Sequence, residues 1–462
     1  MKGGHALLLA TIAVSMFLDG LDGTIVNVAL PTIAESFGIS TGDTSWVVTV
    51  YFLMMAGLIL VFGRLCDMGA LKRILVAGMV IFSMGSLCCG LSSSLALLLA
   101  SRAFQGVGAA MLASSAVMLG VKYLPSERLG LAMSLVVLGS SLGIAIGPSL
   151  GAVITEYASW HWIFFINVPI GLLAAAMAWR AVPADSGFER GSVDAAGSAM
   201  LFAAIVAGLY AVERIPSEGV TAVSAVAAAL CVIIFAVFVR YERGRESPVL
   251  NLGLFRNRDF DRATLAYVLV NTALMGAMYL MPFFLRQAMG LDTLWSGIVL
   301  SVQSVSMIAC SLVSGRYSDR YGDRPFAIAA CLMLMLNLLM LALVDEATPL
   351  AYVVVALLVG GTVWGIGGGP MGARMVDALG DADKGSGSSM MTFVMYFSSA
   401  LGTALFAGLF GLVSGEGSSS ISDLPLDSFL DGFTACMAIA FVLAAACLYL
   451  AWSLKSDRGQ AR

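Results

Sequence analysis

The stretch GRLCDMGALKR, residues 63–73, returns later in the chain as GRYSDRYGDRP, residues 315–325. Gly63, Arg64 and Asp67 have counterparts at one common offset, and each copy follows the second long apolar run of its half. A short loop that merely collects Gly, Asp and Arg is the alternative, but it would not reproduce both the spacing and the place along the chain. The recurrence therefore predicts two related halves.

The composition places these halves in a membrane. Of 462 residues, 59% are hydrophobic and only 12% are charged, whereas soluble domains carry about 25% charged residues. Apolar runs of about 20 residues, the length that a helix needs to cross a bilayer, recur along the whole chain. A transmembrane β-barrel would instead show short segments of alternating polarity. The sequence predicts an all-α membrane protein that crosses the bilayer many times.

The apolar runs predict fourteen transmembrane helices. They cover about residues 6–30, 44–62, 74–92, 95–119, 129–154, 161–180, 194–213, 220–240, 262–285, 294–314, 326–344, 349–374, 388–413 and 432–453. Residues 1–180 are predicted to form an N-terminal six-helix bundle, and residues 262–462 a C-terminal six-helix bundle with a short tail. Residues 181–261 hold two additional helices, at about 194–240, and a cytoplasmic linker.

The basic residues test this count, because cytoplasmic loops collect Lys and Arg. With the N-terminus inside, only Arg214 and Arg286 fall in outer loops and only Arg102 falls within a span, out of 25 Lys and Arg residues. An error of one helix would destroy this alternation. Both termini are therefore predicted to be cytoplasmic. Parallel halves of this kind are typical of transporters in which one half rocks against the other around a midplane site.

Further motifs resemble one known family. LDGTIVNVALP (21–31), RAFQGVGAA (102–110), GPSLGA (147–152) and WHWIFFINVPIG (160–171) are similar to helix motifs of the major facilitator superfamily, and within it of the fourteen-helix drug:proton antiporters. The loop motif at 63–73 resembles that family's loop between helices two and three. Met68 stands where the family usually has a base and Ala70 where it usually has Gly, so the first loop departs from the family's charge pattern. In the fifth-helix motif Ala152 stands in place of a second Gly.

The resemblance implies a fold and a function. The fold is the major facilitator fold, two six-helix bundles plus two helices. The function is proton-coupled antiport that exports lipophilic, mainly cationic drugs across the cell membrane, with antibiotic resistance as a consequence. The partners are small lipophilic molecules, protons and the bilayer; no cofactor, metal or nucleic acid is expected. The alternatives are a dedicated exporter of one metabolite or self-made antibiotic and, remotely, a non-transporting sensor.

An enzyme is not expected. The sequence contains no HExxH motif and no Walker loop, which are the signatures of zinc proteases and of nucleotide-driven pumps. Its eight cysteines form no CxxC pattern that would indicate a metal site.

Residues 17–31, FLDGLDGTIVNVALP, place two acids, Asp19 and Asp22, inside the first apolar run. Ionised acids in hydrocarbon are costly and are therefore expected to be functional, and such burial favours proton exchange near neutral pH. Asp19 is predicted near the midplane and Asp22 further out, on one helix face, with coupled protonation. The family motif points to Asp22 as the coupling acid, whereas Asp19 rests on its depth alone. The alternative for each is a structural hydrogen-bond acceptor.

Arg102 is the one base within a span, at a depth that matches Asp22. An ion pair between them would oppose the effect of burial on the acid. The resemblance directs Arg102 and Gln105 toward the first helix. The alternative is an arginine that reaches toward the membrane surface or braces backbone carbonyls.

A substrate cavity for varied cations is expected to use aromatic rings and methionines. The candidates are polar and aromatic residues within the spans. They are Phe17, Asn27, Tyr51, Gln105, Tyr279, Phe283, Trp364 and Tyr396.

Two further motifs are predicted to act in gating. Glycines recur every fourth position in the fifth span and give one smooth face for close helix packing; these are Gly139, Gly143, Gly147 and Gly151, with a proline at Pro148. The loop motifs are predicted to latch the cytoplasmic side through Gly63, Asp67, Lys72, Arg73, Gly315, Arg316, Asp319, Arg320, Gly322 and Arg324. The alternatives are close packing without gating, and charges that only set the topology.

Overall fold

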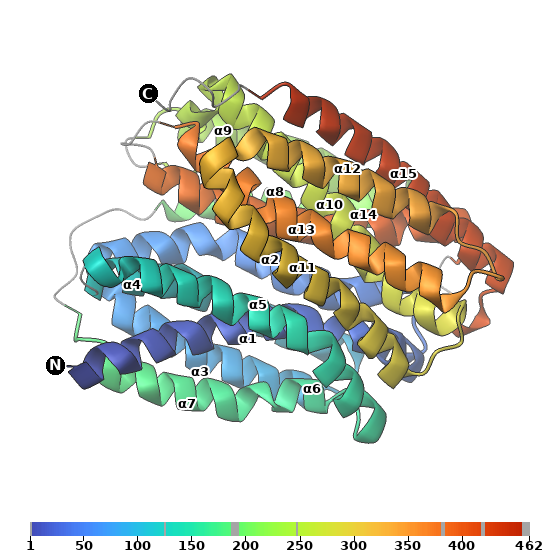
Figure 1. Cartoon of the computed structure of the whole chain (residues 1–462), viewed down its shortest axis with the longest axis horizontal. Helices are drawn as coiled ribbons and strands as arrows, with labels where there is room; N and C mark the ends of the chain where they lie inside the picture. Colours follow the sequence, from blue (N-terminus) through green and yellow to red (C-terminus); the bar gives the residue numbers. More distant parts are fainter. Residues whose placement is uncertain are drawn as a thin grey trace.

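The computed structural model describes residues 2–123, 126–185, 194–245, 248–379, 384–416 and 421–454. Regular structure in these residues is helical throughout (Figure 1). The helices are α1 (Lys2–Phe37), α2 (Thr41–Leu65), η1 (Cys66–Ala70), α3 (Leu71–Gly90), α4 (Leu95–Tyr123), α5 (Ser126–Tyr157), α6 (Trp162–Phe165), α7 (Asn167–Ala181), α8 (Ala195–Glu218), α9 (Ala222–Glu242), η2 (Leu252–Arg256), α10 (Arg258–Gln287), α11 (Thr293–Tyr321), α12 (Asp323–Ala342), α13 (Leu350–Asp377), α14 (Lys384–Ser414), η3 (Ile421–Asp423) and α15 (Leu426–Trp452).

The number of spans agrees with the prediction. Thirteen segments of the described chain are long and apolar enough to cross a membrane, and one of them, residues 41–90, contains both α2 and α3. Gly69 interrupts that segment within η1 with a φ of 101°, a conformation that side chains other than glycine adopt only at a cost. Beyond it the two helices diverge, because α2 packs on α8 and α14 whereas α3 packs on α7. The fourteen predicted spans are therefore present.

The observed helices extend past the predicted spans, by about seven residues at the ends of α1 and α11. An apolar run marks only the hydrocarbon part of a helix, whereas the backbone hydrogen bonds continue into polar caps. At the start of α2, for example, the Ser40 side chain accepts a hydrogen bond from the Asp43 N–H, as N-cap residues commonly do.

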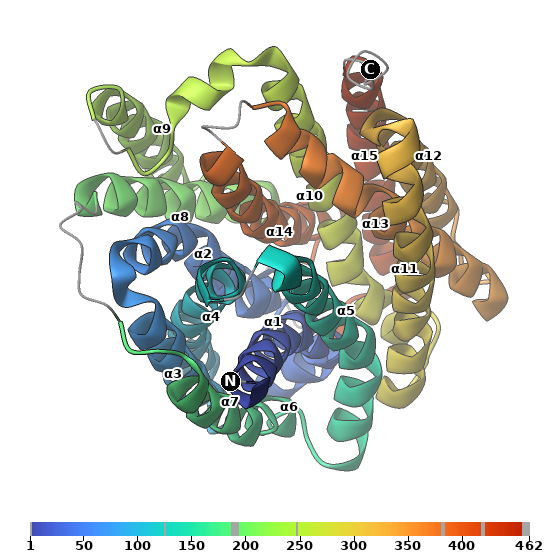
Figure 2. The same cartoon turned by 60° about the vertical axis from the view of Figure 1, so that its left-hand side comes forward.

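The spans gather into two groups that meet along two seams. In the first group α1 packs on α5 and α7, and α3 on α4; in the second, α10 packs on α14 and α15, and α11 and α12 on α13. One seam is formed by α2 and α14, the other by α5 and α11. The additional helix α8 packs against both α2 and α14, and α9 packs on α8 (Figure 2). The α2/α14 seam is thus covered by an extra helix.

The two ends of the bundle differ. The start of α1 and the end of α15 lie at the same end (Figure 1), which we call the terminal end. It also holds η1 and the turn at Gly322. The opposite end, here the distal end, holds the connections from α1 to α2 and from α14 to α15.

Candidate functional site

A cavity of about 1410 Å³ lies between the two groups of helices. Its wall includes Asn27 and Tyr279 in the interior and Gly322, Asp323 and Asn257 at the terminal end. No residue of the distal loops lines it in the described chain. The cavity therefore runs from the interior of the bundle to the terminal end and is closed toward the distal end.

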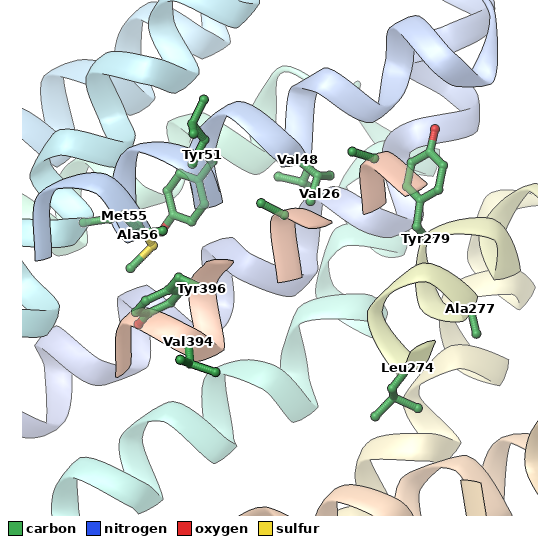
Figure 3. Close-up of a cluster of buried hydrophobic side chains, with 14 of the residues drawn as sticks. Val26, Val48, Tyr51, Met55, Ala56, Leu274, Ala277, Tyr279, Val394 and Tyr396 are labelled. Atoms are coloured by element: carbon green, nitrogen blue, oxygen red, sulfur yellow. The ribbon is translucent and has the colours of Figure 1, made fainter. Parts of the chain in front are cut away.

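Asp19 lies on the cavity wall, midway along the helix that runs from Lys2 to Phe37. Its Oδ2 accepts a hydrogen bond from the Tyr396 hydroxyl at 3.1 Å. Tyr396 belongs to α14, so this contact joins the two groups of helices. Figure 3 shows Tyr396 in a cluster of buried side chains that also includes Tyr51 and Tyr279. Within the described residues no base forms an ion pair with Asp19.

Asp22 is fully buried and is not part of the cavity wall. Its carboxylate accepts three hydrogen bonds: from Arg102 Nη1 at 2.7 Å, from Gln105 Nε2 at 2.8 Å and from Asn167 Nδ2 at 2.9 Å. The ion pair predicted between Asp22 and Arg102 is therefore present, and amides from α4 and α7 complete it.

Arg102 makes further contacts besides the one to Asp22. Its Nε donates to the Val47 carbonyl at 3.0 Å and its Nη1 to Gln105 Oε1 at 2.7 Å, while the guanidinium stacks 4.2 Å from the centre of the Tyr51 ring. A buried ion pair is stable only when further hydrogen bonds satisfy both partners, and this one meets that condition. The network holds α1, α2, α4 and α7 together as one unit.

The structure divides the predicted cavity residues into two sets. Four line the cavity, namely Asn27, Tyr279, Trp364 and Tyr396, and four do not, namely Phe17, Tyr51, Gln105 and Phe283. Tyr51 and Gln105 face Arg102 instead. Phe283 packs behind Tyr279, with ring centres 5.6 Å apart, and Phe17 packs against the apolar core. Sequence cannot separate these sets, because every face of a buried span is apolar.

Other cavity residues were not anticipated. Asn271 lines the wall from α10, and its Nδ2 donates to Ser398 Oγ at 2.7 Å and to the Met395 carbonyl at 2.8 Å. Gln303 and Met278 line it as well. The signal for Asn271 was available, because it is a lone amide in an apolar run, as Asn167 is in the first half.

The glycine face of α5 packs on α1, as the motif predicts. A Cβ atom on Gly139 would lie 2.5 Å from the Ala13 carbonyl oxygen, and one on Gly151 2.6 Å from that of Ile25. Gly143 and Gly147 are equally close to α1, and Pro148 lies inside the continuous helix. The seal that this face would make during gating remains a prediction.

The first loop motif makes its contacts within the first group of helices. The backbone N–H groups of Lys72 and Arg73 donate to the Asp185 carboxylate at 2.9 and 3.3 Å, and Lys72 Nζ lies 5.0 Å from the Trp179 ring centre. No atom lies within 4 Å of the position that a Cβ on Gly63 would take, and Asp67 lies in η1. In the described chain these hydrogen bonds and this ring contact of Lys72 and Arg73 join the motif only to residues at and after α7, so the predicted latch stays a prediction.

The second loop motif borders the cavity through Gly315 and Gly322. Gly322 has a φ of 81° at the junction of α11 and α12. Arg324 Nη2 donates to the Trp452 carbonyl at 2.6 Å, and Arg320 lies over the Tyr321 ring. The side chains of Arg316 and Asp319 lie outside the described residues.

Comparison with known proteins identifies the family. The sequence model of the Major Facilitator Superfamily matches residues 12–403. The riboflavin transporter RibZ of Clostridioides difficile is 30% identical over 405 residues, 87% of this chain and 88% of that protein. The putative multidrug resistance protein MdtD of Pectobacterium atrosepticum is 30% identical over 404 residues, with 87% and 86% covered.

Two solved structures share the fold. A bacterial homologue of the human lysosomal transporter Spinster, inward-facing and occupied, superposes with a TM-score of 0.69 at 14% identity over 98% of this chain and 97% of that one. The human organic anion transporter MFSD10 gives a TM-score of 0.66 at 16% identity over 96% and 99%. The family match spans most of the sequence, and the chain therefore belongs to the Major Facilitator Superfamily.

Proposed function

We propose that this protein is a proton-coupled antiporter that exports lipophilic, mainly cationic compounds from the cell by alternating access. Its terminal end faces the cytoplasm, where most of the Lys and Arg residues are predicted to lie. The cavity then takes its substrate from inside, and the proton is the only coupling agent, without a cofactor. Resistance to toxic compounds, including antibiotics, would follow.

Asp19 carries this proposal. It is an acid on a water-accessible wall at the middle of a transmembrane helix, and no base among the described residues neutralises it. In such a place an ionised carboxylate needs a counter-charge. Either a proton or a cationic substrate can supply that charge, but not both at once. Mutually exclusive binding of this kind couples the two flows in opposite directions, provided that the carrier reorients only with a proton or a substrate bound.

Asp22 and Arg102 serve a different purpose in this scheme. Because their charges cancel within one network, they hold the first group rigid behind Asp19. We propose that residues 1–180 and 262–462 are the two halves that move. The distal contacts between them would break on opening outward: Arg286 with Glu35 at 2.7 Å and Ser149 with Ser301 at 2.5 Å.

The cavity wall suits large cations of varied shape. Tyr396 and Phe52 stack with ring centres 6.2 Å apart beside Asp19, and aromatic faces attract organic cations. Four methionines also line the wall, namely Met275, Met278, Met307 and Met395. Their flexible side chains adapt to different ligands, which favours a broad substrate range.

A dedicated exporter of one metabolite is the second candidate. The similarity to a riboflavin transporter favours it, as do the amides of Asn27, Asn271 and Gln303 on the wall, which suit a hydrogen-bonding ligand. Comparing the transport of a cationic dye, a neutral drug and a zwitterion separates the candidates. If the protein transports only one of these three classes of compound, the result supports the dedicated exporter.

The test of proton coupling uses purified protein in sealed inverted vesicles. An acidic lumen should drive uptake of the cationic dye, and collapse of the pH gradient should stop it. Dye transport that ignores the pH gradient would refute antiport. A countertransport assay without any gradient provides the control that the protein is active.

A further inference from the structure

A second buried acid lies at the distal end, where the two groups of helices close on each other. Glu416 follows α14 and is only 2% exposed. Its Oε1 accepts the backbone N–H of Thr41, the first residue of α2, at 2.9 Å, and its Oε2 accepts the Thr41 hydroxyl. Tyr279 of α10 donates its hydroxyl to the Thr41 carbonyl. The connection after α14 and helix α10 thus both contact the first residue of α2.

The charged groups around this contact come from three helices. Asp43 belongs to α2, Glu213 and Arg214 to α8, and Tyr279 to α10. Arg214 pairs with Asp43 at 2.7 Å and with Glu213 at 3.0 Å. In the described chain no base forms an ion pair with Glu416, so its charge is held only by the hydrogen bonds from Thr41.

Glu416 lies in the connection after α14, outside the membrane-spanning segments. Burial raises the pKa of its carboxyl from 4.5 to about 7, against the opposite effect of the Thr41 hydrogen bonds. Opening the distal end would return the carboxyl to water and to its ordinary pKa. The closed state therefore binds the proton more tightly than the open state, and by linkage proton binding must favour closure.

We propose that Glu416 is a second proton-binding site, which takes its proton from the external side and thereby favours closure of the distal end around α2. The inference rests on the proposed alternating access, but it does not require Asp19 to be the coupling acid. The direction of the pH effect follows from this shift. Protonation of Glu416 favours closure of the distal end as the pH falls below about 7, and this stabilisation of the closed state is lost as the pH rises through that value. An external acid load would thus return the empty carrier to its inward-facing form.

Hydrogen–deuterium exchange of the start of α2, residues 41–50, tests this in the native chain in lipid nanodiscs. After correction for the intrinsic effect of pH, protection should be about 30-fold greater at pH 5.5 than at pH 8.5. Glu416→Gln resembles the protonated acid, so we expect high protection at both values. The matched control is Asp423→Asn, which removes an exposed acid at the same end and should keep the native response.

A second variant covers the case in which Glu416→Gln does not fold. Thr41→Val removes the hydroxyl that favours the ionised acid, so the midpoint of the response should move to higher pH. A native chain with no pH response, a Glu416→Gln variant that keeps it, or an unmoved midpoint in Thr41→Val would each overturn the proposal. Since no substrate or gradient is used, these outcomes are independent of whether antiport itself is confirmed.

Discussion

The two acids of α1, Asp19 and Asp22, lie three residues apart and have different surroundings. Asp22 lies behind the cavity wall, with Arg102, Gln105 and Asn167 around it. Asp19 lies on that wall, with one hydrogen bond from the opposite group of helices. Their similar position along α1 therefore does not distinguish the two acids. What distinguishes them is that Asp22 is paired with a base and Asp19, among the described residues, is not.

From this difference we expect Asp22 and Asp19 to have separate roles, which experiments can distinguish. A neutralised acid should matter mainly for folding, because its removal leaves a buried arginine without a partner. An acid without a base should matter mainly for transport, because its charge is available to a proton or a cation. The predictions below test that division, beginning with the largest effect.

Asp19→Asn should abolish transport driven by the pH gradient, leaving only the background leak of the vesicles. The amide keeps the shape and the hydrogen bond from Tyr396 but binds no proton, so the coupling is lost. Asp19→Glu, which keeps the charge, should retain part of the activity. Dye uptake into inverted vesicles measures both. Native rates in Asp19→Asn would remove Asp19 from the mechanism.

Arg102→Ala should destabilise the fold by about 3–5 kcal/mol, because it leaves the carboxylate of Asp22 buried without its base. Asp22→Asn should destabilise it in the same way by isolating the arginine. The free energy of unfolding in detergent, from denaturant titration, measures each loss. A stable but inactive Asp22→Asn protein would instead assign the coupling role to Asp22, as its motif suggests.

The double variant Asp22→Asn with Arg102→Met sharpens this test. Removing both charges together leaves neither one isolated, so stability should recover relative to either single variant. If the two single losses simply added, the pair would not be the unit that the contacts describe.

The sequence was sufficient for some of these features and not for others. The fourteen spans could be counted, because hydrocarbon thickness sets the length of an apolar run, and the Asp22–Arg102 pair could be inferred from equal depth. The sequence could not predict which acid faces the cavity, because Asp19 and Asp22 share one side of α1 and only Asp19 belongs to the cavity wall. Glu416 was not identified from the sequence, because its hydrogen-bond partner Thr41 is 375 residues away in the chain.

Gly143→Ala should destabilise the protein by about 1–3 kcal/mol, the usual cost of overpacking. A Cβ there would lie 2.5 Å from the Leu21 nitrogen and 2.9 Å from Gly20, so α1 must shift away from α5 next to Asp19. Gly63→Ala is the matched control: nothing lies within 4 Å of its Cβ position, and its stability should be unchanged or slightly higher. Thermal unfolding of the two variants, measured side by side, compares them.

Tyr396→Phe should have the smallest effect, because it removes one hydroxyl at 3.1 Å from Asp19 and keeps the ring against Phe52. A hydrogen bond of this kind contributes about 1 kcal/mol, so gradient-driven uptake should fall only about fivefold. Stability should not change, since this hydroxyl faces the cavity and water can replace it. A loss as complete as that of Asp19→Asn would mean that the bond between the two halves, and not the acid's own charge, couples the flows.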